Sequence, residues 1–163
     1  MNGGFLGDLT AVLAVLAALG AGLIAGTFFA FSTFVMQALG RQPAAQGIAA
    51  MQTINVTVIN PWFLGAFIGT ALLALAVAAL GLWQGWAGAT PLLLGGALLY
   101  LVGCFGVTAA FNVPRNEALA KVAADSADGT ALWRRYLSGW TAWNHVRTVA
   151  SLAASACFIL ALV

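Results

Sequence analysis

The feature of this chain that most constrains its fold is a set of four long apolar runs separated by short polar stretches. The runs cover about residues 9–38, 61–80, 91–111 and 143–163. A run of roughly 20 apolar residues crosses the hydrocarbon core of a bilayer as a helix, because the helix satisfies its own backbone polar groups. Asn60-Pro61 and Thr90-Pro91 resemble helix starts, since Asn and Thr cap helices and Pro suits the first helical position.

The small number of charged residues supports a membrane protein. Only 6% of the 163 residues are charged, while 63% are hydrophobic, and soluble domains carry about 25% charged residues. The first run lacks a preceding basic segment and is too long for the apolar region of a signal peptide. We therefore expect a single integral membrane domain over residues 1–163, folded as an all-α, four-helix transmembrane bundle.

The positions of the cations predict the orientation in the membrane. The connections after the first and third runs share one face and carry Arg41, Arg115, Lys121, Arg134 and Arg135. By the positive-inside rule, both termini are expected on the non-cytoplasmic side of a bacterial-type inner or plasma membrane. Aromatic residues near the two faces are expected to form interfacial belts: Trp83 and Trp86 at one face, and Trp133, Tyr136, Trp140 and Trp143 at the other.

The connection between the first two runs has an amphipathic helical pattern. In Ala44 to Thr57 and the residue after it, apolar side chains recur at helical spacing opposite polar ones: Ile48, Met51, Ile54 and Val58 against Gln46, Gln52 and Asn55. Such a helix is expected to lie at the membrane interface, where it could act as a lid. The connection between the last two runs, residues 113–138, is expected to hold a short helix and a polar turn.

Small residues and cysteines are assigned structural roles. Close helix packing is favoured by glycines in the first run, Gly20, Gly22 and Gly26, with a GxxxG pattern at the last two, and by Ala150, Ala153, Ala154 and Ala156 in the fourth run. A bundle this small and apolar could also form a homo-oligomer. Cys104 and Cys157 fall inside predicted helices, and no CxxC or Cys/His metal spacing occurs. Both are expected to be buried structural thiols.

Polar side chains gather at one end of all four predicted helices. They are Thr27, Ser32, Thr33 and Gln37; Gln52, Asn55, Thr57 and Asn60; Thr108 and Asn112; and Thr141, Asn144, His145, Arg147, Thr148 and Ser151. The opposite ends are almost wholly apolar. This pattern predicts one polar pocket near the cytoplasmic face.

The only histidine and one arginine lie at the start of the fourth run. An ionisable residue near the bilayer core is a functional hypothesis, because burying it is costly. The alternative is that Arg147 extends to the interface and His145 packs between helices. At about 100° per residue, Thr141, Asn144, Thr148 and Ser151 form one stripe toward the bundle, while His145 and Arg147 diverge by about 160°. An ideal helix would not direct both at one atom, so one of the two could be structural.

Three motifs resemble those of a known family of small four-helix membrane proteins, the anthrone oxygenase-like proteins. They are Asn60-Pro61, Phe111-Asn112-Val-Pro114-Arg-Asn116 and Trp140-Thr-Ala-Trp143-Asn144-His145-Val-Arg147-Thr148. The resemblance covers nearly the whole chain. It implies an oxidoreductase that uses dioxygen to oxidise or oxygenate a small flat aromatic substrate, such as an anthrone, giving a quinone.

The residues leave two mechanisms open. One His, two Cys at lipid depth and no acidic residue within a span cannot supply a multi-ligand metal site. Haem needs one axial imidazole, which His145 would provide as the ligand of the iron, with Arg115, Arg134 or Arg147 facing the propionates and Met36, Tyr100 or Tyr136 as possible neighbours of the sixth position. Without a cofactor, His145 would act as general base while Arg147, Asn144 and Asn112 stabilise the enolate.

These hypotheses define the candidate site. The catalytic candidates are His145, Arg147, Asn144 and Asn112, and the candidates for holding a cofactor are His145, Arg115, Asn60, Asn55 and Trp143. The expected partners are the lipid bilayer and the aromatic substrate, with no nucleic acid. A non-enzymatic scaffold or small carrier is the alternative, although the internal repeats typical of carriers are not visible in the sequence.

Overall fold

The computed structural model describes residues 4–85 and 88–163, and every regular element within them is helical. The first stretch consists of α1 (Phe5–Ala30), the π-helical segment η1 (Phe31–Val35) and α2 (Met36–Gly40). It is followed by α3 (Ala44–Thr57) and α4 (Pro61–Gln84). A further continuous stretch consists of α5 (Ala89–Leu98), the π-helical segments η2 (Leu99–Gly106) and η3 (Thr108–Asn112), and α6 (Val113–Ala120). The last helix is α7 (Ala127–Leu160).

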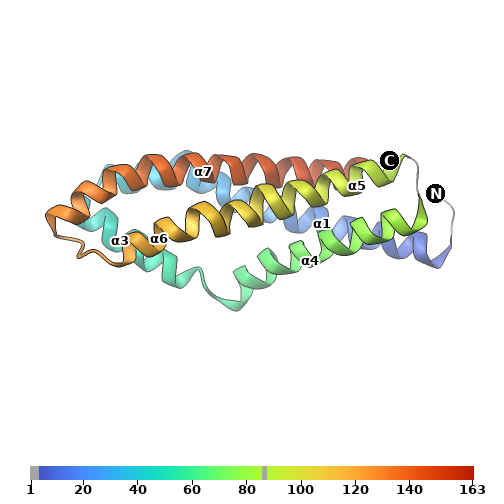
Figure 1. The fold of residues 1–163 in the computed structure, drawn as a ribbon, viewed down its shortest axis with the longest axis horizontal. Helices are drawn as coiled ribbons and strands as arrows, with labels where there is room; N and C mark the ends of the chain where they lie inside the picture. Colours follow the sequence, from blue (N-terminus) through green and yellow to red (C-terminus); the bar gives the residue numbers. More distant parts are fainter. Residues whose placement is uncertain (1–3, 86–87) are drawn as a thin grey trace.

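The long stretches lie lengthwise beside one another (Figure 1). α1 packs on α4 and α7, and α5 packs on the same two helices, so each long stretch has two neighbours. The start of α1 and the end of α7 lie at one end of the molecule, and α3 and α6 lie at the other (Figure 1). This arrangement brings α3 and the turn between α6 and α7 to the same end of the molecule.

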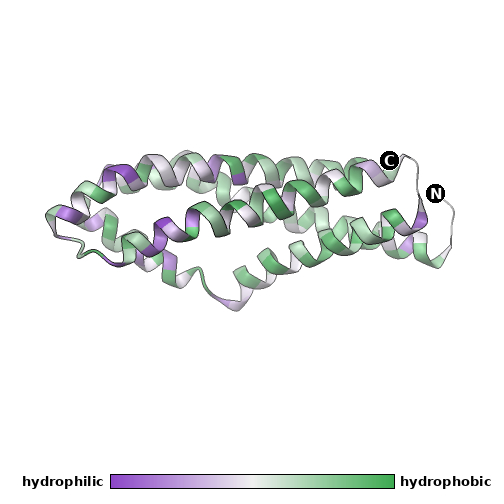
Figure 2. Ribbon diagram, viewed as in Figure 1, coloured by the Kyte–Doolittle hydropathy of each residue, from purple (hydrophilic) through white to green (hydrophobic). Residues whose placement is uncertain are grey.

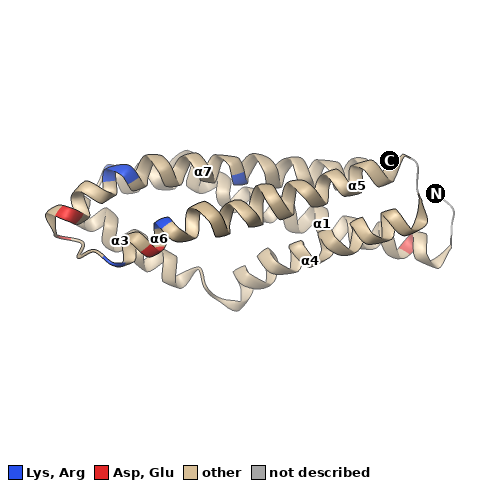
Figure 3. Cartoon of the chain, viewed as in Figure 1, with Lys and Arg blue, Asp and Glu red and all other residues tan. Residues whose placement is uncertain are grey.

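Three helical stretches are long and apolar enough to cross a membrane: Phe5–Gly40, Pro61–Gln84 and Ala89–Ala120. They contain the first three predicted spans, and each is longer than predicted. The fourth predicted span forms the second half of α7, where Asn144, His145 and Arg147 interrupt the apolar sequence. Green, hydrophobic ribbon dominates the half of the molecule that holds the termini (Figure 2), and most charged residues lie near α3 and α6 (Figure 3).

Local sequence accounts for several helix boundaries. The predicted cap at Asn60 is confirmed, because its Oδ1 accepts hydrogen bonds from the backbone N–H groups of Trp62 and Phe63, both at 3.0 Å. The predicted start at Thr90-Pro91 is wrong by two residues: α5 begins at Ala89 instead of Pro91, and the Thr90 hydroxyl donates to the Gly81 carbonyl oxygen at 2.8 Å. The side chain of Thr90 therefore ties α5 to the end of α4 instead of capping its own helix.

The third stretch continues past the predicted end at Phe111. Pro114 has no N–H and its ring would clash with the preceding turn of an α-helix. Here the wider π-helical segment η3 (Thr108–Asn112) directly precedes α6, which has Pro in its first turn. The π-helical turn offers the proline a way to continue the helix without a break.

The start of α7 lies 16 residues before the predicted span, which began at residue 143. The Ser126 hydroxyl accepts a hydrogen bond from the Gly129 N–H at 2.9 Å and caps the helix. The additional turns of α7 pack against α2, α3 and α6 in a second apolar cluster, separate from the cluster between the long stretches. Its buried members are Met36, Ile48, Met51, Leu119, Trp133, Tyr136 and Trp140.

This second cluster corrects part of the predicted aromatic belt. Trp133, Tyr136 and Trp140 are buried inside the protein and do not face an interface. Trp83 is exposed as predicted, Trp143 is half-buried, and Trp86 lies outside the described residues. The belt prediction failed for the buried residues because a linear sequence does not show that other helices cover this part of α7.

The predicted amphipathic helix is confirmed at Ala44–Thr57 as α3. Its apolar side chains Ile48 and Met51 are fully buried in the second cluster. Gln52 Nε2 donates to the carbonyl oxygens of Leu119 at 2.8 Å and Val122 at 3.0 Å, where α6 ends. α3 is therefore held against the protein by both its apolar and its polar face.

Of the predicted packing glycines, Gly20 lies in close contact, since a Cβ there would overlap Thr70 Oγ1. The GxxxG pair itself is more open, and further close contacts occur at other glycines. Gly26 has open space where a side chain would begin, and at Gly22 the nearest atom is Ser155 Oγ at 3.5 Å. A Cβ at Gly96 would lie 2.7 Å from the Phe158 ring, and one at Gly103 would lie 2.6 Å from Ala150 Cβ. Both cysteines are free; Cys104 is buried as predicted, whereas Cys157 is only half-buried.

Candidate functional site

Arg147 is a buried cation in the interior of the molecule. It is only 4% exposed, which contradicts the hypothesis that it extends to the interface. Its guanidinium carbon lies 4.0 Å from the centre of the Phe28 ring and 5.0 Å from that of Trp140. Such cation–π contacts contribute about 2 kcal/mol or more when they are shielded from water. The aromatic rings thus replace part of the hydration that Arg147 has lost.

The hydrogen bonds of Arg147 go to neutral groups. Nη1 donates to Thr108 Oγ1 at 3.2 Å, and Nη2 donates to Asn144 Oδ1 at 2.6 Å. All four Asp and Glu side chains are exposed, so the guanidinium has no buried carboxylate beside it in the described part of the chain. The positive charge of Arg147 is therefore not neutralised by the protein around it.

Asn144 connects Arg147 to α1 and η1. Its Nδ2 donates to the Phe28 carbonyl oxygen and to Ser32 Oγ, both at 2.7 Å. The Ser32 and Thr148 hydroxyl oxygens lie 3.1 Å apart, and the Thr148 hydroxyl donates to the Asn144 carbonyl oxygen at 2.9 Å. We call the set Ser32, Thr108, Asn112, Asn144, Arg147 and Thr148 the Arg147 cluster; all are buried except Thr108, which is half-buried.

The residues of the Arg147 cluster that lie outside α7 are all in π-helical segments. Ser32 lies in η1, and Thr108 and Asn112 lie in η3. A π-helical turn inserts an extra residue and re-aims the side chains around it, and such turns are frequent at functional sites. These local distortions turn polar side chains toward α7, where Asn144, Arg147 and Thr148 meet them.

Within the part of the chain that the structure describes, several buried polar atoms of this region have no hydrogen-bond partner. They include Arg147 Nε, Asn112 Oδ1 and Ser151 Oγ. Asn112 uses its Nδ2 to donate to the Trp140 carbonyl oxygen at 3.2 Å. Unpaired buried polar groups cost about 1–3 kcal/mol each, so the region keeps hydrogen-bonding capacity at some expense of stability.

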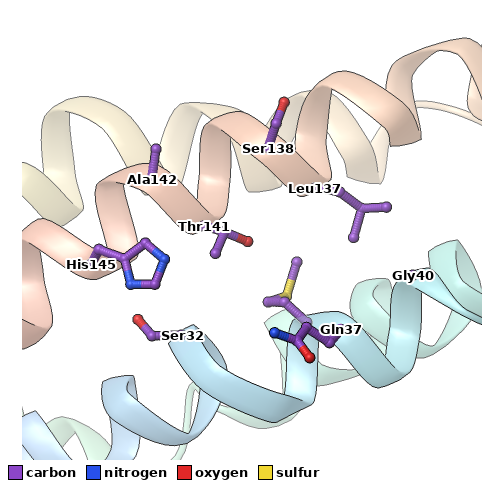
Figure 4. Close-up of a pocket in the computed structure, with 9 residues that line it drawn as sticks. Ser32, Gln37, Gly40, Leu137, Ser138, Thr141, Ala142 and His145 are labelled. Atoms are coloured by element: carbon purple, nitrogen blue, oxygen red, sulfur yellow. The ribbon is translucent and has the colours of Figure 1, made fainter.

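His145 lies on another side of α7 from Arg147. Its ring is exposed, in agreement with the predicted divergence of the two side chains on the helix. It lines a groove of about 490 Å³ between η1, α2 and α7, together with Ser32, Met36, Gln37, Gly40, Leu137, Ser138, Thr141 and Ala142. Figure 4 shows the imidazole ring and the Ser32 side chain facing each other at one end of this groove.

The predicted stripe of α7 divides between the two environments. Asn144, Thr148 and Ser151 are buried toward the bundle, whereas Thr141 is half-buried and lines the groove. Of the four catalytic candidates, the structure brings Arg147, Asn144 and Asn112 into one interior region. It places His145 in the groove, with Ser32 between the groove and the interior.

The other predicted site residues make separate contacts. Asn60 caps α4, and Arg115 Nη1 donates to the Phe111 carbonyl oxygen at 2.7 Å. Trp143 stacks on Phe111 with ring centres 3.6 Å apart. Asn55 is half-buried in α3 with Nδ2 unpaired. These contacts are sufficient to explain Asn60, Arg115 and Trp143 as parts of the scaffold.

Asn116 supports the Arg147 cluster through its hydrogen bond to Trp140. Its Oδ1 accepts hydrogen bonds from Tyr136 Oη and from Trp140 Nε1, both at 2.8 Å. The Tyr136 side chain is itself buried. Asn116 thereby fixes Trp140, whose ring contacts Arg147.

Sequence reasoning missed Ser32 and Thr108 as members of the site. Both were recognised only among the polar residues at one end of the predicted helices. A possible signal is that each is a hydroxyl residue within an apolar helix at the same membrane depth as Asn144 and Arg147. Within residues 4–85 and 88–163, no three His, Cys, Asp or Glu side chains come close enough together to hold a metal ion.

Every regular element of the described residues is helical, and three of the helical stretches have the length and apolar composition of membrane spans, as in small helical membrane proteins. The chain is a member of the anthrone oxygenase family, whose pattern it matches over residues 60–157. The matched region runs from the Asn60 cap into the last turns of α7 and includes His145 and Arg147. It does not include Ser32 of η1 or the α2 residues that line the groove. Comparison with curated proteins and with solved structures gave no match.

Proposed function

We propose that this protein is an integral membrane oxidoreductase that oxidises a flat aromatic substrate with dioxygen in the groove beside His145. The proposal rests on a base and a cation that lie on different sides of α7. His145 is the only histidine and is exposed in the groove, while the buried and unneutralised Arg147 is linked to the groove through Asn144 and Ser32.

The name of the family suggests the chemistry. An anthrone has a methylene group flanked by two aromatic rings and conjugated with a carbonyl, so loss of a proton gives a stabilised enolate. This electron-rich anion can reduce dioxygen directly. Overall, the methylene loses both hydrogens and gains one oxygen atom as a carbonyl, and the second oxygen atom leaves as water. The substrate supplies all of the electrons, so the balance requires no further reductant.

The proposed roles follow from the placement of the residues. His145 accepts the proton from the substrate carbon, since imidazole is the side chain best suited to proton transfer near neutral pH. Positioned general bases contribute about 10²–10⁴-fold to a rate. The charge of Arg147 favours the enolate, because preorganised positive charge in a water-poor site stabilises a developing anion. Asn144 transmits this interaction, and Asn112 holds the backbone of α7 at Trp140.

The walls of the groove suit a flat amphipathic molecule. Met36, Leu137 and Ala142 present apolar surface, and Ser32, Thr141 and His145 present polar atoms. A substrate of this kind dissolves in the bilayer and can reach the groove from the side. The groove therefore matches a substrate that is apolar over most of its area and polar at its oxygen atoms.

The test is the oxidation of an anthrone by detergent-purified protein in the presence of dioxygen. We expect His145→Ala to lower the rate at least about 100-fold with an unchanged melting temperature, because the ring is exposed. Added imidazole should restore part of the activity of this variant. Arg134→Gln, a change at an exposed residue of α7 that does not line the groove, should leave the oxidation rate at the wild-type value. A His145→Ala protein with full activity would rule out the base, and an inactive wild-type protein would favour a scaffold or carrier role.

Haem-dependent oxidation is a second candidate, favoured by the presence of His145 and Met36 in one groove. Imidazole and thioether groups are axial ligands of haem iron. The groove lining contains no Arg or Lys, and Arg115 and Arg147 are engaged with Phe111 and Asn144. The residues thus fit an axial ligand but leave the propionates without partners. A Soret absorption band in the purified wild type that disappears in His145→Ala would establish this alternative.

We further propose that all four long stretches cross the bilayer with both termini on the non-cytoplasmic side. The support is that the start of α1 and the end of α7 lie together (Figure 1). Most charged residues lie at the opposite end, near α3 and α6 (Figure 3). In this arrangement the groove and the Arg147 cluster lie in the half of the membrane nearer the charged end.

A further inference from the structure

Ser32 lies at the boundary between the groove and the Arg147 cluster. It lines the groove with His145, and it is only 8% exposed. Figure 4 shows its hydroxyl directed toward the His145 ring. The same oxygen atom lies 2.7 Å from Asn144 Nδ2 and 3.1 Å from Thr148 Oγ1. A single side chain therefore contacts both the open groove and the buried hydrogen-bond network.

The direction of each hydrogen bond can be derived from the chemistry of the groups. Arg147 has only donors, so Nη2 donates to Asn144 Oδ1. The amide nitrogen of Asn144 then donates to Ser32 Oγ. The Thr148 hydroxyl uses its proton for the Asn144 carbonyl oxygen. Ser32 thus accepts from Asn144, and its own proton is free to point to Thr148 or to an oxygen atom in the groove.

This series of hydrogen bonds begins at the Arg147 cation and runs in one direction, through Asn144 to Ser32. Hydrogen bonds that involve an ionised group are roughly twice as strong as neutral ones, and bonds in a chain polarise one another. Arg147 makes the Asn144 amide a stronger donor, and Asn144 in turn makes the Ser32 hydroxyl a stronger donor. The shielding of Arg147 by Phe28 and Trp140 keeps water from weakening this effect.

We infer that Ser32 is the residue that binds the oxygen atom of the substrate and delivers the charge of Arg147 to it. The inference rests on the proposed function and specifies its substrate class: a flat aromatic molecule with a phenolate or enolate oxygen. On binding, that oxygen replaces Thr148 as the acceptor of the Ser32 proton. His145, across the end of the groove, faces the carbon that loses its proton.

The arrangement explains why Arg147 does not need to touch the substrate. A guanidinium exposed in the groove would be surrounded by water or lipid head groups, which would weaken its field. Buried behind Ser32, it contributes positive potential without blocking the space that the substrate occupies. Ser32 is accordingly a binding and positioning residue, whereas the charge comes from Arg147.

The experiment measures the ionisation of a bound dye at equilibrium and needs no turnover. The probe is a hydroxyanthraquinone whose phenol and phenolate forms have different visible absorption spectra. Full-length protein in detergent is titrated with the dye, and the apparent pKa of the bound phenol is determined from a pH series. We expect wild-type protein to lower this pKa by about one unit or more, a tenfold increase in the ionisation constant. Ser32→Ala and Arg147→Gln should each abolish most of the shift.

Controls separate this role from a structural one. Thr33→Ala removes a neighbouring hydroxyl that donates within its own helix to the Phe29 carbonyl oxygen, and it should leave the shift unchanged. Ser32→Thr keeps a hydroxyl and should retain much of the shift. The double variant Ser32→Ala/Arg147→Gln should lose no more of the dye pKa shift than either single variant, because both changes interrupt the same series of hydrogen bonds. Melting curves identify any variant that does not fold.

Two results would overturn the inference. One is a Ser32→Ala protein that folds, binds the dye and shifts its pKa as the wild type does. The other is a wild-type protein that fails to bind the dye or to change its ionisation. A wild type that shifts the dye pKa but does not oxidise anthrones would instead refute the proposed function and leave the oxygen-binding role of Ser32 intact.

Discussion

At the scale of single residues, neighbouring ionisable side chains have opposite environments. His145 is exposed in a groove, while Arg147, two positions later, is buried among neutral and aromatic groups. Helical geometry separates them, because two residues correspond to more than half a turn. Chemistry that needs both groups must therefore pass through residues of another helix, and Ser32 is suitably placed.

Asn60 provides a prediction at the same scale. Because its Oδ1 accepts from two backbone N–H groups at the start of α4, Asn60→Ala should lower the stability by about 1 kcal/mol. Asn60→Asp and Asn60→Ser, which retain a capping oxygen, should lie close to the wild type in thermal melts. If Asn60 instead held a cofactor, the Asp and Ser variants would lose that cofactor without losing stability, and the capping explanation would be insufficient.

At the scale of the helices, two features place the site. The π-helical segments η1 and η3 turn Ser32, Thr108 and Asn112 toward α7. Close contacts between helices then require small residues at particular positions. α5 approaches α7 at Gly96, which leaves room for the Phe158 ring.

Substitutions at Gly95 and Gly96 test whether α5 and α7 pack closely at Gly96. A Cβ at Gly96 would lie 2.7–3.0 Å from three atoms of the Phe158 ring, whereas one at Gly95 would meet nothing within 4 Å. We expect Gly96→Ala to destabilise the protein by about 1–3 kcal/mol, the usual cost of overpacking. Gly95→Ala should be neutral or slightly stabilising, since Ala favours helix more than Gly does. Equal melting temperatures for the two variants in detergent would show that α5 and α7 do not pack in this way.

At the scale of the whole molecule, the long stretches alternate in direction, and α3 and α6 cover the beginning of α7. The apolar cluster of Ile48, Met51, Leu119, Trp133 and Tyr136 makes this end a small packed unit. Gln52 and Asn116 add hydrogen bonds within it. The groove beside His145 opens where this unit meets the long stretches.

The orientation in the membrane can be tested with reporter fusions. A reporter that is active only outside the cytoplasm should work when fused after Val163, whereas one inserted between α6 and α7, at Ala124, should work only as a cytoplasmic reporter. The reason is that cations gather at the α6–α7 end and positive connections remain in the cytoplasm. Active cytoplasmic reporters at both positions would show that α7 does not cross the bilayer.

The sequence alone determined the features that depend on local chemistry. Apolar run length set the long helices, the Asn60-Pro61 pair set the start of α4, and helical spacing set both α3 and the divergence of His145 from Arg147. The resemblance in the Trp140–Thr148 motif correctly indicated the family. Each of these properties follows from residues that are close in the chain.

Only the tertiary structure decided which side chains meet. The burial of Trp133, Tyr136 and Trp140 depends on α2, α3 and α6 folding over α7. The partners of Arg147 come from α1, η3 and α7, and Ser32 joins them through a π-helical turn. Several of these contacts join residues more than thirty positions apart, such as Thr108 and Arg147 or Ser32 and Asn144. Local periodicity carries no information about such pairs, because they depend on how separate helices rotate and pack against one another.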